Sequence, residues 1–242
     1  MAKNSTLGFI PAKGGSTRLA RKNVRNLGGK SLIAWAAEAA WDSGVIDRLV
    51  LSTEDEAIAD QARALGIDVP FMRPPELARD PAEADDVALH ALEALEDAGD
   101  TYETIVILLP TCPFRSAEDV RGAYELFTER DRPFVMSVAE FSHTPFAAFQ
   151  MDAGAGLTPM FQQYLEQPTK TLPKVFRPNG AVHVLDVKAF RTAGSYLAQP
   201  LVGYVMPRER SFDIDNEEDF REAEIHLAMA AERAAAAGNE SP

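Results

Sequence analysis

The chain is 242 residues long, and its 24 lysines and arginines face 37 aspartates and glutamates, which gives a formal net charge of -13 at pH 7. This acidic balance argues against a nucleic acid as a partner, although it allows a small anion to bind in a local basic pocket. A single cysteine excludes an intramolecular disulfide and favours a reducing, cytoplasmic setting, and no apolar run approaches the length of a membrane span.

Short apolar runs alternate with segments of helical periodicity along the chain. The expected strands are residues 7–10, 48–52, 67–71, 105–109, 134–138, 181–185 and 201–205. The expected helices are residues 31–42, 55–65, 85–97, 117–129 and 217–236. This alternation predicts one α/β domain over residues 1–242, with a doubly wound, mostly parallel sheet that carries helices on both faces.

Three helix starts have recognisable capping signals. Thr53 followed by Glu56, and Ser116 followed by Asp119, are typical of capping boxes, and Ser31 is expected to be the N-cap of the first helix. In doubly wound sheets, ligands bind beyond the carboxyl ends of the strands, so the segments that follow the strands are the candidates for a site.

The segment after the first expected strand concentrates glycines and cations between residues 13 and 23. Gly14 and Gly15 allow backbone N–H groups to approach a ligand and form a concave anion site. Lysines and arginines beside them add charge-assisted donors for phosphate oxygens. We therefore predict phosphate binding rather than a solvated surface loop. Neither G-x-x-x-x-G-K-[ST] nor G-x-G-x-x-G is present, which excludes the P-loop and dinucleotide signatures.

Residues 140–174 interrupt the alternation of strands and helices. The segment is rich in proline, glutamine and threonine, and it is too long and too aromatic for a plain surface loop. Its aromatic residues are Phe141, Phe146, Phe149, Phe161 and Tyr164. We expect an excursion that packs on another subunit or over the active site.

The sequence Asp213-Ile214-Asp215 is a candidate metal site. Residues two apart in an extended segment point to the same side, so both carboxylates can reach one hard cation such as Mg²⁺. The alternative is that Asp215 only caps the helix expected from residue 217, which leaves Asp213 unexplained. We predict that the pair binds a metal.

Three arginines follow expected strands or flank prolines. Arg177 precedes Pro178 and the turn pair Asn179-Gly180, so it would project from a rigid bend. It could bind a carboxylate or phosphate of a ligand. The alternative is a surface arginine beside a hairpin turn. Arg73, before two prolines, is interpreted as structural, whereas Arg115 could bind an anion or fix its own loop.

Zinc and covalent chemistry are disfavoured. The four histidines form no H-x-x-x-H or H-E-x-x-H pair, and no Gly-x-Ser-x-Gly elbow is present. Cys112 has no basic partner nearby in sequence, and His90 and His226 are expected to pack within helices.

Together these motifs resemble the acylneuraminate (CMP-sialic acid) cytidylyltransferase family. The resemblance is carried by five ordered segments, residues 10–23, 71–77, 109–115, 176–181 and 211–215. It implies a nucleotidyltransferase-like fold and a reaction of CTP with a 2-keto sugar acid. In that reaction the anomeric hydroxyl attacks the α-phosphorus and pyrophosphate leaves. It also implies Mg²⁺ as cofactor and a homodimer to which the excursion contributes.

The resemblance further implies roles for individual residues. The nucleotide would be bound by Ala12, Lys13, Gly14, Gly15, Ser16, Lys22, Asn23, Arg73, Thr111 and Arg115. The sugar acid would be bound by Arg177, Asn179, Tyr196 and Leu197, and the metal by Asp213 and Asp215. Lys13, Lys22 and the two aspartates would be the catalytic residues.

Some positions depart from the family pattern. Lys13 stands where the family usually has an arginine, and Ala20 stands where a proline is common. Leu109 occupies the position of a glutamine that is associated with cytosine recognition, and Ala147 occupies that of a lysine near the sugar. These differences leave the acid substrate open among sialic, legionaminic and pseudaminic acids and Kdo, with residues 177–180 more similar to the neuraminate and legionaminate branches. A non-catalytic nucleotide-binding module is the alternative from another class.

Overall fold

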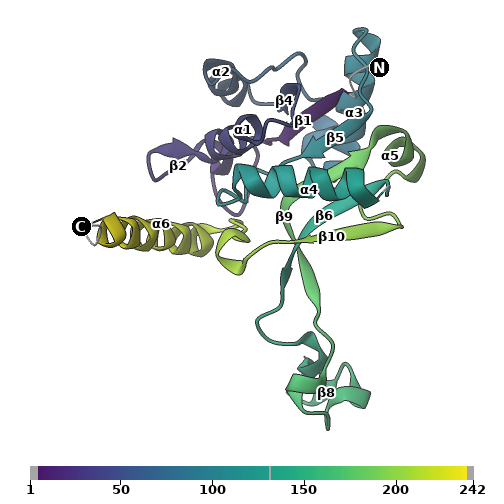
Figure 1. Cartoon of the computed structure of the whole chain (residues 1–242), viewed down its shortest axis with the longest axis vertical. Helices are drawn as coiled ribbons and strands as arrows, with labels where there is room; N and C mark the ends of the chain where they lie inside the picture. Colours follow the sequence, from purple (N-terminus) through teal and green to yellow (C-terminus); the bar gives the residue numbers. More distant parts are fainter. Residues whose placement is uncertain (1–4, 131, 239–242) are drawn as a thin grey trace.

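The computed structural model describes residues 5–130 and 132–238, so the outermost ends of the predicted domain lie outside the described residues. Figure 1 shows a central sheet with helices packed on it, an arm that extends away from the sheet, and a long C-terminal helix to one side. The main sheet has six strands in the order β10-β6-β9-β5-β1-β4. These are β1 (Thr6–Pro11), β4 (Arg48–Ser52), β5 (Thr104–Ile107), β6 (Phe134–Glu140), β9 (Phe176–Asp186) and β10 (Leu201–Val205).

The predicted mostly parallel sheet is confirmed. Strand β1 pairs in parallel with β4 and β5, and β6 pairs in parallel with β10. Strand β9 is antiparallel to both of its neighbours, β5 and β6. It joins the parallel pairs into one sheet because the chain returns from the arm directly beside β6 (Figure 1).

Helices cover both faces of the sheet, as predicted. Ile10 of β1 packs in one core with α1 (Leu32–Ser43), α2 (Glu56–Ala64) and α4 (Ala117–Arg130). Leu7 and Phe9 point to the opposite face, where α3 (Ala84–Asp97) and α5 (Val187–Ala193) complete a second core. Helix α5 has only seven residues, too few for a helical period to be evident in the sequence.

Two of the three predicted helix caps are confirmed. The Ser31 hydroxyl accepts from the α1 backbone at 3.2 Å, and Ser116 and Asp119 exchange backbone-to-side-chain hydrogen bonds at 2.9 and 3.3 Å. The capping box at Thr53 is wrong. Asp55 caps α2 by accepting two backbone N–H groups, and the Thr53 hydroxyl instead accepts the Asp55 N–H at 3.2 Å.

The predicted strand at residues 67–71 is also wrong. Only an isolated bridge between Val50 and Asp68 forms there, with backbone hydrogen bonds of 2.8 and 3.1 Å to β4. Pro70 follows at once and has no N–H to continue the ladder, so the chain leaves the edge strand.

The bend predicted at residues 177–180 lies inside β9 rather than before it. Gly180 has a φ of 68°, and the pairing of β9 with β6 shifts register between Met136 and Val138. A Cβ at Gly180 would stand 3.1 Å from Leu109 and 3.3 Å from the Cys112 sulfur. The turn signal therefore marks an irregular strand that passes close to the loop after β5.

Residues 141–175, here called the arm, correspond to the predicted excursion of residues 140–174. They contain the hairpin of β7 (Phe149–Met151) and β8 (Leu157–Pro159) and extend away from the sheet (Figure 1). Phe146 packs on Phe161 and Tyr164, with ring centroids 5.5 and 4.4 Å apart, so the arm has a small core of its own.

Helix α6 (Glu217–Gly238) begins just after the Asp213-Asp215 segment. Its first turns pack through Phe220 and Ala223 on Leu27, which belongs to the short β2 (Asn26–Leu27) and β3 (Lys30–Ser31) ribbon. Among residues 5–130 and 132–238, no helix is both long and apolar enough to cross a membrane.

Candidate active site

A cavity of about 180 Å³, here called the small cavity, opens at the carboxyl ends of β1 and β5. It is lined by several residues that the sequence assigned to nucleotide binding: Lys13, Lys22, Asn23, Arg73 and Thr111. Apolar side chains of Leu77, Val87 and Leu109 line it as well. The small cavity therefore combines an apolar slot with a cluster of cations, the composition that a nucleotide requires.

The glycine-rich loop, residues 12–23, is held against the end of β4. The Asn23 amide donates to the Lys13 carbonyl at 2.8 Å, and the Gly14 N–H donates to Glu54 Oε1 at 2.7 Å. A Cβ at Gly14 would stand 2.7 Å from an Asp55 carboxylate oxygen, whereas Gly15 faces open space. Glycine at position 14 therefore permits the close approach of the loop to β4.

The sequence placed residues 52–55 at a carboxyl end of the sheet but gave Glu54 no role in the site. Its carboxylate takes the Gly14 N–H that was predicted for phosphate, and Oε2 stands 3.9 Å from the Arg73 guanidinium. Ser16 and the exposed Gly15 leave the outer part of the loop open, and Ala12 is buried behind it.

Arg73 is both structural and part of the small cavity. The guanidinium donates to the Ser52 hydroxyl at 3.1 Å and to the Ser52 carbonyl at 2.5 Å. Burial lowers the pKa of Arg73, and the nearby Glu54 carboxylate opposes that shift. The guanidinium thus fixes the end of β4 while it lines the cavity.

Arg115 lies behind the loop after β5 and is not among the residues that line the small cavity. Its Nη2 donates to the Leu109 carbonyl, while Nε and Nη1 are buried with no hydrogen-bond partner among the described residues. Burial lowers the pKa of Arg115 to about 10. Of the two roles left open by the sequence, the structure shows the one that fixes its own loop.

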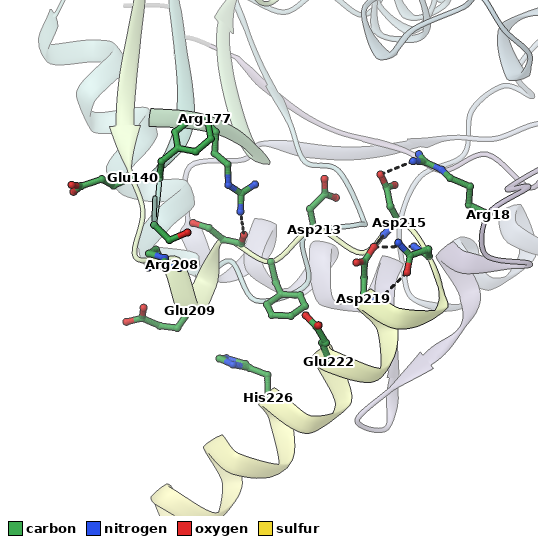
Figure 2. A pocket seen from close by; sticks show the side chains of 15 residues that line it. Arg18, Glu140, Arg177, Arg208, Glu209, Asp213, Asp215, Asp219, Glu222 and His226 are labelled. Atoms are coloured by element: carbon green, nitrogen blue, oxygen red, sulfur yellow. Dashed lines mark hydrogen bonds and ion pairs between the residues drawn. The ribbon is translucent and has the colours of Figure 1, made fainter. Parts of the chain in front are cut away.

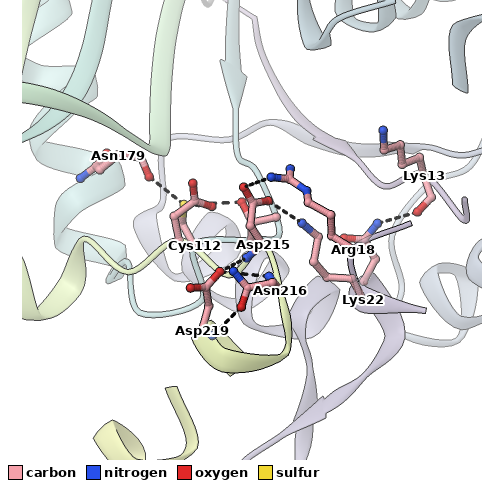
Figure 3. A network of polar contacts seen from close by, with 11 residues as sticks. Lys13, Arg18, Lys22, Cys112, Asn179, Asp215, Asn216 and Asp219 are labelled. Carbon is pink, nitrogen blue, oxygen red and sulfur yellow. Dashed lines mark hydrogen bonds and ion pairs between the residues drawn. The ribbon is translucent and has the colours of Figure 1, made fainter. Parts of the chain in front are cut away.

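Asp213 and Asp215 lie beside the same loop, as Figure 3 shows for Asp215. The Ile214 N–H donates to the Thr111 carbonyl at 2.8 Å, and the Ile214 side chain is buried. Asp215 forms ion pairs with Lys22 at 3.0 Å and with Arg18 at 3.1 Å. Asp213 is exposed on one side, but the protein packed around its carboxyl group and the charge of Asp215 raise the pKa of Asp213, which the Thr111 hydroxyl partly offsets.

Capping of α6 does not account for Asp215. Asn216 accepts the N–H groups of Glu218 at 2.8 Å and Asp219 at 3.1 Å, and Asp219 accepts the Asp215 N–H at 2.7 Å (Figure 3). Asn216 and Asp219 thus satisfy the start of α6, and the Asp215 carboxylate is directed to Lys22 and Arg18.

A second cavity, here called the large cavity, has a volume of about 870 Å³ and is lined by both Asp213 and Asp215. Figure 2 shows Arg177, Asp213 and Asp215 along one side of it and Glu222 and His226 of α6 along another. The sequence predicted the first three residues but not the contribution of α6.

Three residues that the resemblance assigned to the sugar acid lie outside the large cavity. Asn179 is buried, where it accepts from Ser137 at 2.6 Å and donates to Ser211 at 2.9 Å, so it braces β9. Tyr196 packs on His183 with a centroid distance of 4.4 Å, and Leu197 is 51% exposed. None of the three lines the large cavity.

Cys112 is buried behind Asp213. Its thiol donates to the Asn179 carbonyl at 2.8 Å, and burial followed by the Asp213 charge raises the pKa of the thiol to about 12. A thiol so far from ionisation is a poor nucleophile, so the geometry favours a reaction without a covalent cysteine intermediate.

His183 is expected to make the stability of the protein sensitive to acid. Burial, followed by the charge of Arg115, lowers the pKa of His183 from 6.5 to about 4. The unfolded chain therefore binds a proton at a higher pH than the folded chain, and acidification from pH 7 to pH 5 favours unfolding by about 2 kcal/mol through this residue.

Between pH 7 and pH 5, the free energy of unfolding of His183→Phe is expected to fall by about 2 kcal/mol less than that of the wild type. Urea titrations at both pH values measure it, with His143→Gln, in the exposed part of the arm, as the matched control. An unchanged pH dependence in His183→Phe would contradict the assignment.

The fold and the site define a class of protein: an α/β protein with a cavity at its strand ends, lined by cations and apolar side chains, beside a pair of carboxylates. A family model described as cytidylyltransferase matches residues 7–187. The chain belongs to this cytidylyltransferase family, whose members are CTP-dependent nucleotidyltransferases.

Several characterised proteins are similar over most of the chain. Pseudaminic acid cytidylyltransferase of Campylobacter jejuni subsp. jejuni serotype O:2 is 30% identical over 217 residues, which cover 90% of this chain and 94% of that protein. CMP-N,N'-diacetyllegionaminic acid synthase of Legionella pneumophila is 31% identical over 216 residues, which cover 88% of this chain and 92% of that protein. N-acylneuraminate cytidylyltransferase of Escherichia coli O18:K1:H7 is 28% identical over 219 residues, 90% of this chain and 51% of that protein.

The fold is shared with a solved structure of CMP:2-keto-3-deoxy-manno-octonic acid synthetase complexed with CTP. The TM-score is 0.69 at 13% identity, and the match covers 94% of this chain and 99% of that one. At this identity the likeness concerns the fold, and it confirms the predicted nucleotidyltransferase-like architecture.

Proposed function

We propose that the enzyme transfers CMP from CTP to a nonulosonic (sialic-type) acid and releases pyrophosphate. One observation carries the proposal: the ion pair between Lys22 and Asp215 joins the two cavities. Lys22 lines the small cavity and Asp215 lines the large one. A nucleotide in the first and an acid in the second would therefore meet at this pair.

The proposed reaction needs no protein nucleophile. The anomeric hydroxyl of the acid attacks the α-phosphorus of CTP, the bond to the β-phosphate breaks, and pyrophosphate leaves. Such transfers depend on positioning and charge neutralisation. Lys13 and Lys22 would neutralise the phosphates, and Arg177 would pair with the carboxylate of the acid.

The aspartate pair has the chemistry expected for Mg²⁺. Asp213 and Asp215 offer carboxylate oxygens close enough for one charge to raise the pKa of the other group. Within the described residues no group of three or more His, Cys, Asp or Glu could hold a metal, and Mg²⁺ commonly takes its remaining ligands from phosphates and water. When bound, the ion would supply Lewis-acid activation and stabilise the leaving pyrophosphate.

Pyrophosphate release from CTP over a panel of acids tests the proposal. We expect equimolar pyrophosphate and CMP-sugar with at least one of N-acetylneuraminic, legionaminic and pseudaminic acids, the acids suggested by the relatives. Kdo and UTP are the comparison substrates for the acid and the nucleotide. Turnover with Kdo alone would contradict a nonulosonic acceptor.

Lys22→Ala is expected to weaken CTP binding by about 10- to 100-fold, since a charge-assisted contact contributes roughly 1.5–3 kcal/mol. The Lys22 side chain is 11% exposed and faces the small cavity. Lys30→Ala is the matched control, because Lys30 pairs with Glu38 at 2.5 Å and lies over Trp35, away from both cavities. Equal CTP titrations for the two variants would count against the assignment.

We also propose a homodimer formed through the arm. The exposed fractions of Met151, Leu157 and Met160 are 65%, 58% and 60%, an unusual density of apolar surface on one small segment. A cytoplasmic location is part of the same proposal, since Cys112 is a free thiol.

A further inference from the structure

Two ion pairs join the segment that carries Lys22 to the segment that carries Asp215. Lys22 pairs with Asp215 at 3.0 Å (Figure 3). Arg25 pairs with Glu217 through two hydrogen bonds of 2.5 and 2.8 Å, and this second contact is here called the outer pair. Neither Arg25 nor Glu217 lines the small or the large cavity. Any role of the outer pair in the reaction is therefore indirect.

Arg25 is held by more than the charge of Glu217. Its guanidinium lies over the Phe220 ring, 4.0 Å from the centroid, while both Nη atoms donate to the Glu217 carboxylate. A planar guanidinium can make these contacts together, which the ammonium group of a lysine cannot. Because Glu217 and Phe220 both lie at the start of α6, Arg25 fixes its own segment to the beginning of that helix.

Short hydrogen-bonded segments connect the outer pair to Lys22 and Asp215. On one side a 3₁₀ turn begins at Lys22, and the Arg25 N–H donates to the Lys22 carbonyl at 3.2 Å. On the other side Asp215 stands two residues before Glu217, and Asp219 accepts the Asp215 N–H at 2.7 Å. A displacement of the outer pair would therefore be passed on to both inner residues.

A small apolar core lies under the same two segments. Leu19 and Leu27 from the first segment pack in one cluster with Ile214 and Phe220 from the second, and each of the four is at most 3% exposed. Apolar burial is non-directional, so it holds the segments together without fixing the distance between two charged groups. A bidentate ion pair adds that geometric constraint.

We propose that Arg25 is a positioning residue: through the outer pair it holds the backbone segments of Lys22 and Asp215 at the separation that CMP transfer needs. This inference rests on the proposed function. In that reaction Lys22 neutralises a phosphate and Asp215 belongs to the proposed metal pair. A change in their separation would misplace one charge relative to the other, and transfer depends on such positioning.

Steady-state kinetics with Arg25→Gln, Glu217→Gln and the double variant test the assignment. We expect each single substitution to lower kcat about tenfold, less than the roughly 100-fold cost of a misplacement of about 1 Å, because the inner ion pair is retained. KM for the acid should stay unchanged. The double variant should lose no more than either single variant, since two residues that act as one unit are not additive. Arg25→Lys keeps the charge without the bidentate contact and should recover part of the rate.

Arg191→Gln is the matched control. The Arg191 side chain is 34% exposed, against 33% for Arg25, and it pairs with Glu96 at 2.7 Å outside both cavities. Urea titrations should show losses of unfolding free energy of the same order in Arg25→Gln and Arg191→Gln, whereas kcat should fall only in Arg25→Gln.

Wild-type kcat in Arg25→Gln would overturn the inference, and so would losses in the two single variants that multiply in the double variant. An equal loss of kcat in Arg191→Gln would show a general effect of stability and would overturn it too. A wild-type enzyme that releases no pyrophosphate with any acid would instead refute the proposed function, so the two failures are distinguishable.

Discussion

Replacing Asp215 by alanine is expected to lower the rate of CMP transfer by about 10²- to 10³-fold, the range observed when one charge-stabilising group is removed from an active site. Asp215 lines the large cavity, and its carboxylate holds Lys22 and Arg18. The variant would lose one of the two proposed Mg²⁺ ligands and release the cation that joins the two cavities. Pyrophosphate release across a Mg²⁺ titration measures the loss.

The same variant is expected to stay folded, because the Asp215 side chain does not cap α6. Asn216 and Asp219 make those contacts, and the Asp215 backbone N–H is kept in the variant. Circular dichroism and thermal unfolding check this point, with Glu218→Gln as the control on an exposed carboxylate of the same turn. Wild-type activity of Asp215→Ala at limiting Mg²⁺ would remove the pair from the site.

A double substitution in the arm, Met151→Glu with Leu157→Glu, is expected to convert a dimer into a monomer. Most of the activity should be lost as well, because Phe141 and Ser142 of the arm line the large cavity. Met151 and Leu157 are cross-strand partners in the β7–β8 hairpin and lie on one face with Phe149, so the new charges would fall together. Burial of unpaired charges in an apolar interface is strongly unfavourable. Light scattering should give twice the chain mass of 26.4 kDa for the wild type and the single mass for the variant.

Gln163→Glu adds a charge to an exposed position of the arm outside this hairpin and serves as the control. It should remain dimeric and active. A wild-type protein that is monomeric at micromolar concentration and fully active would refute both the dimer and its role in catalysis.

The fold was largely predictable because its signals are local. The bounds of β4 and β10 agree with the apolar runs at residues 48–52 and 201–205, and the start of α6 agrees with the acidic turn at residue 217. The antiparallel direction of β9 was not predictable, since it depends on where the arm returns. The same holds for residues 67–71, whose apolar run cannot reveal that Pro70 ends the pairing.

The proximity of Asp213 and Asp215 was predictable from their spacing, and both line the large cavity, whereas metal binding by the pair stays a prediction. The site was not predictable where a role depends on what surrounds the residue. Asn179 belongs to a recognisable motif, yet its side chain is buried between Ser137 and Ser211. His226 looked like a helix-packing residue, and it does pack on Phe114, but the same ring also lines the large cavity.

The ion pair between Lys22 and Asp215 spans 193 residues of sequence. The last strand of the main sheet, β10, ends at Val205, ten positions before the aspartate. During synthesis, a ribosome that has made all six strands has therefore not yet supplied the carboxylates. Because domains fold as the chain emerges, the sheet can assemble first, and the proposed catalytic centre is completed only once residues 213–215 have followed the last strand.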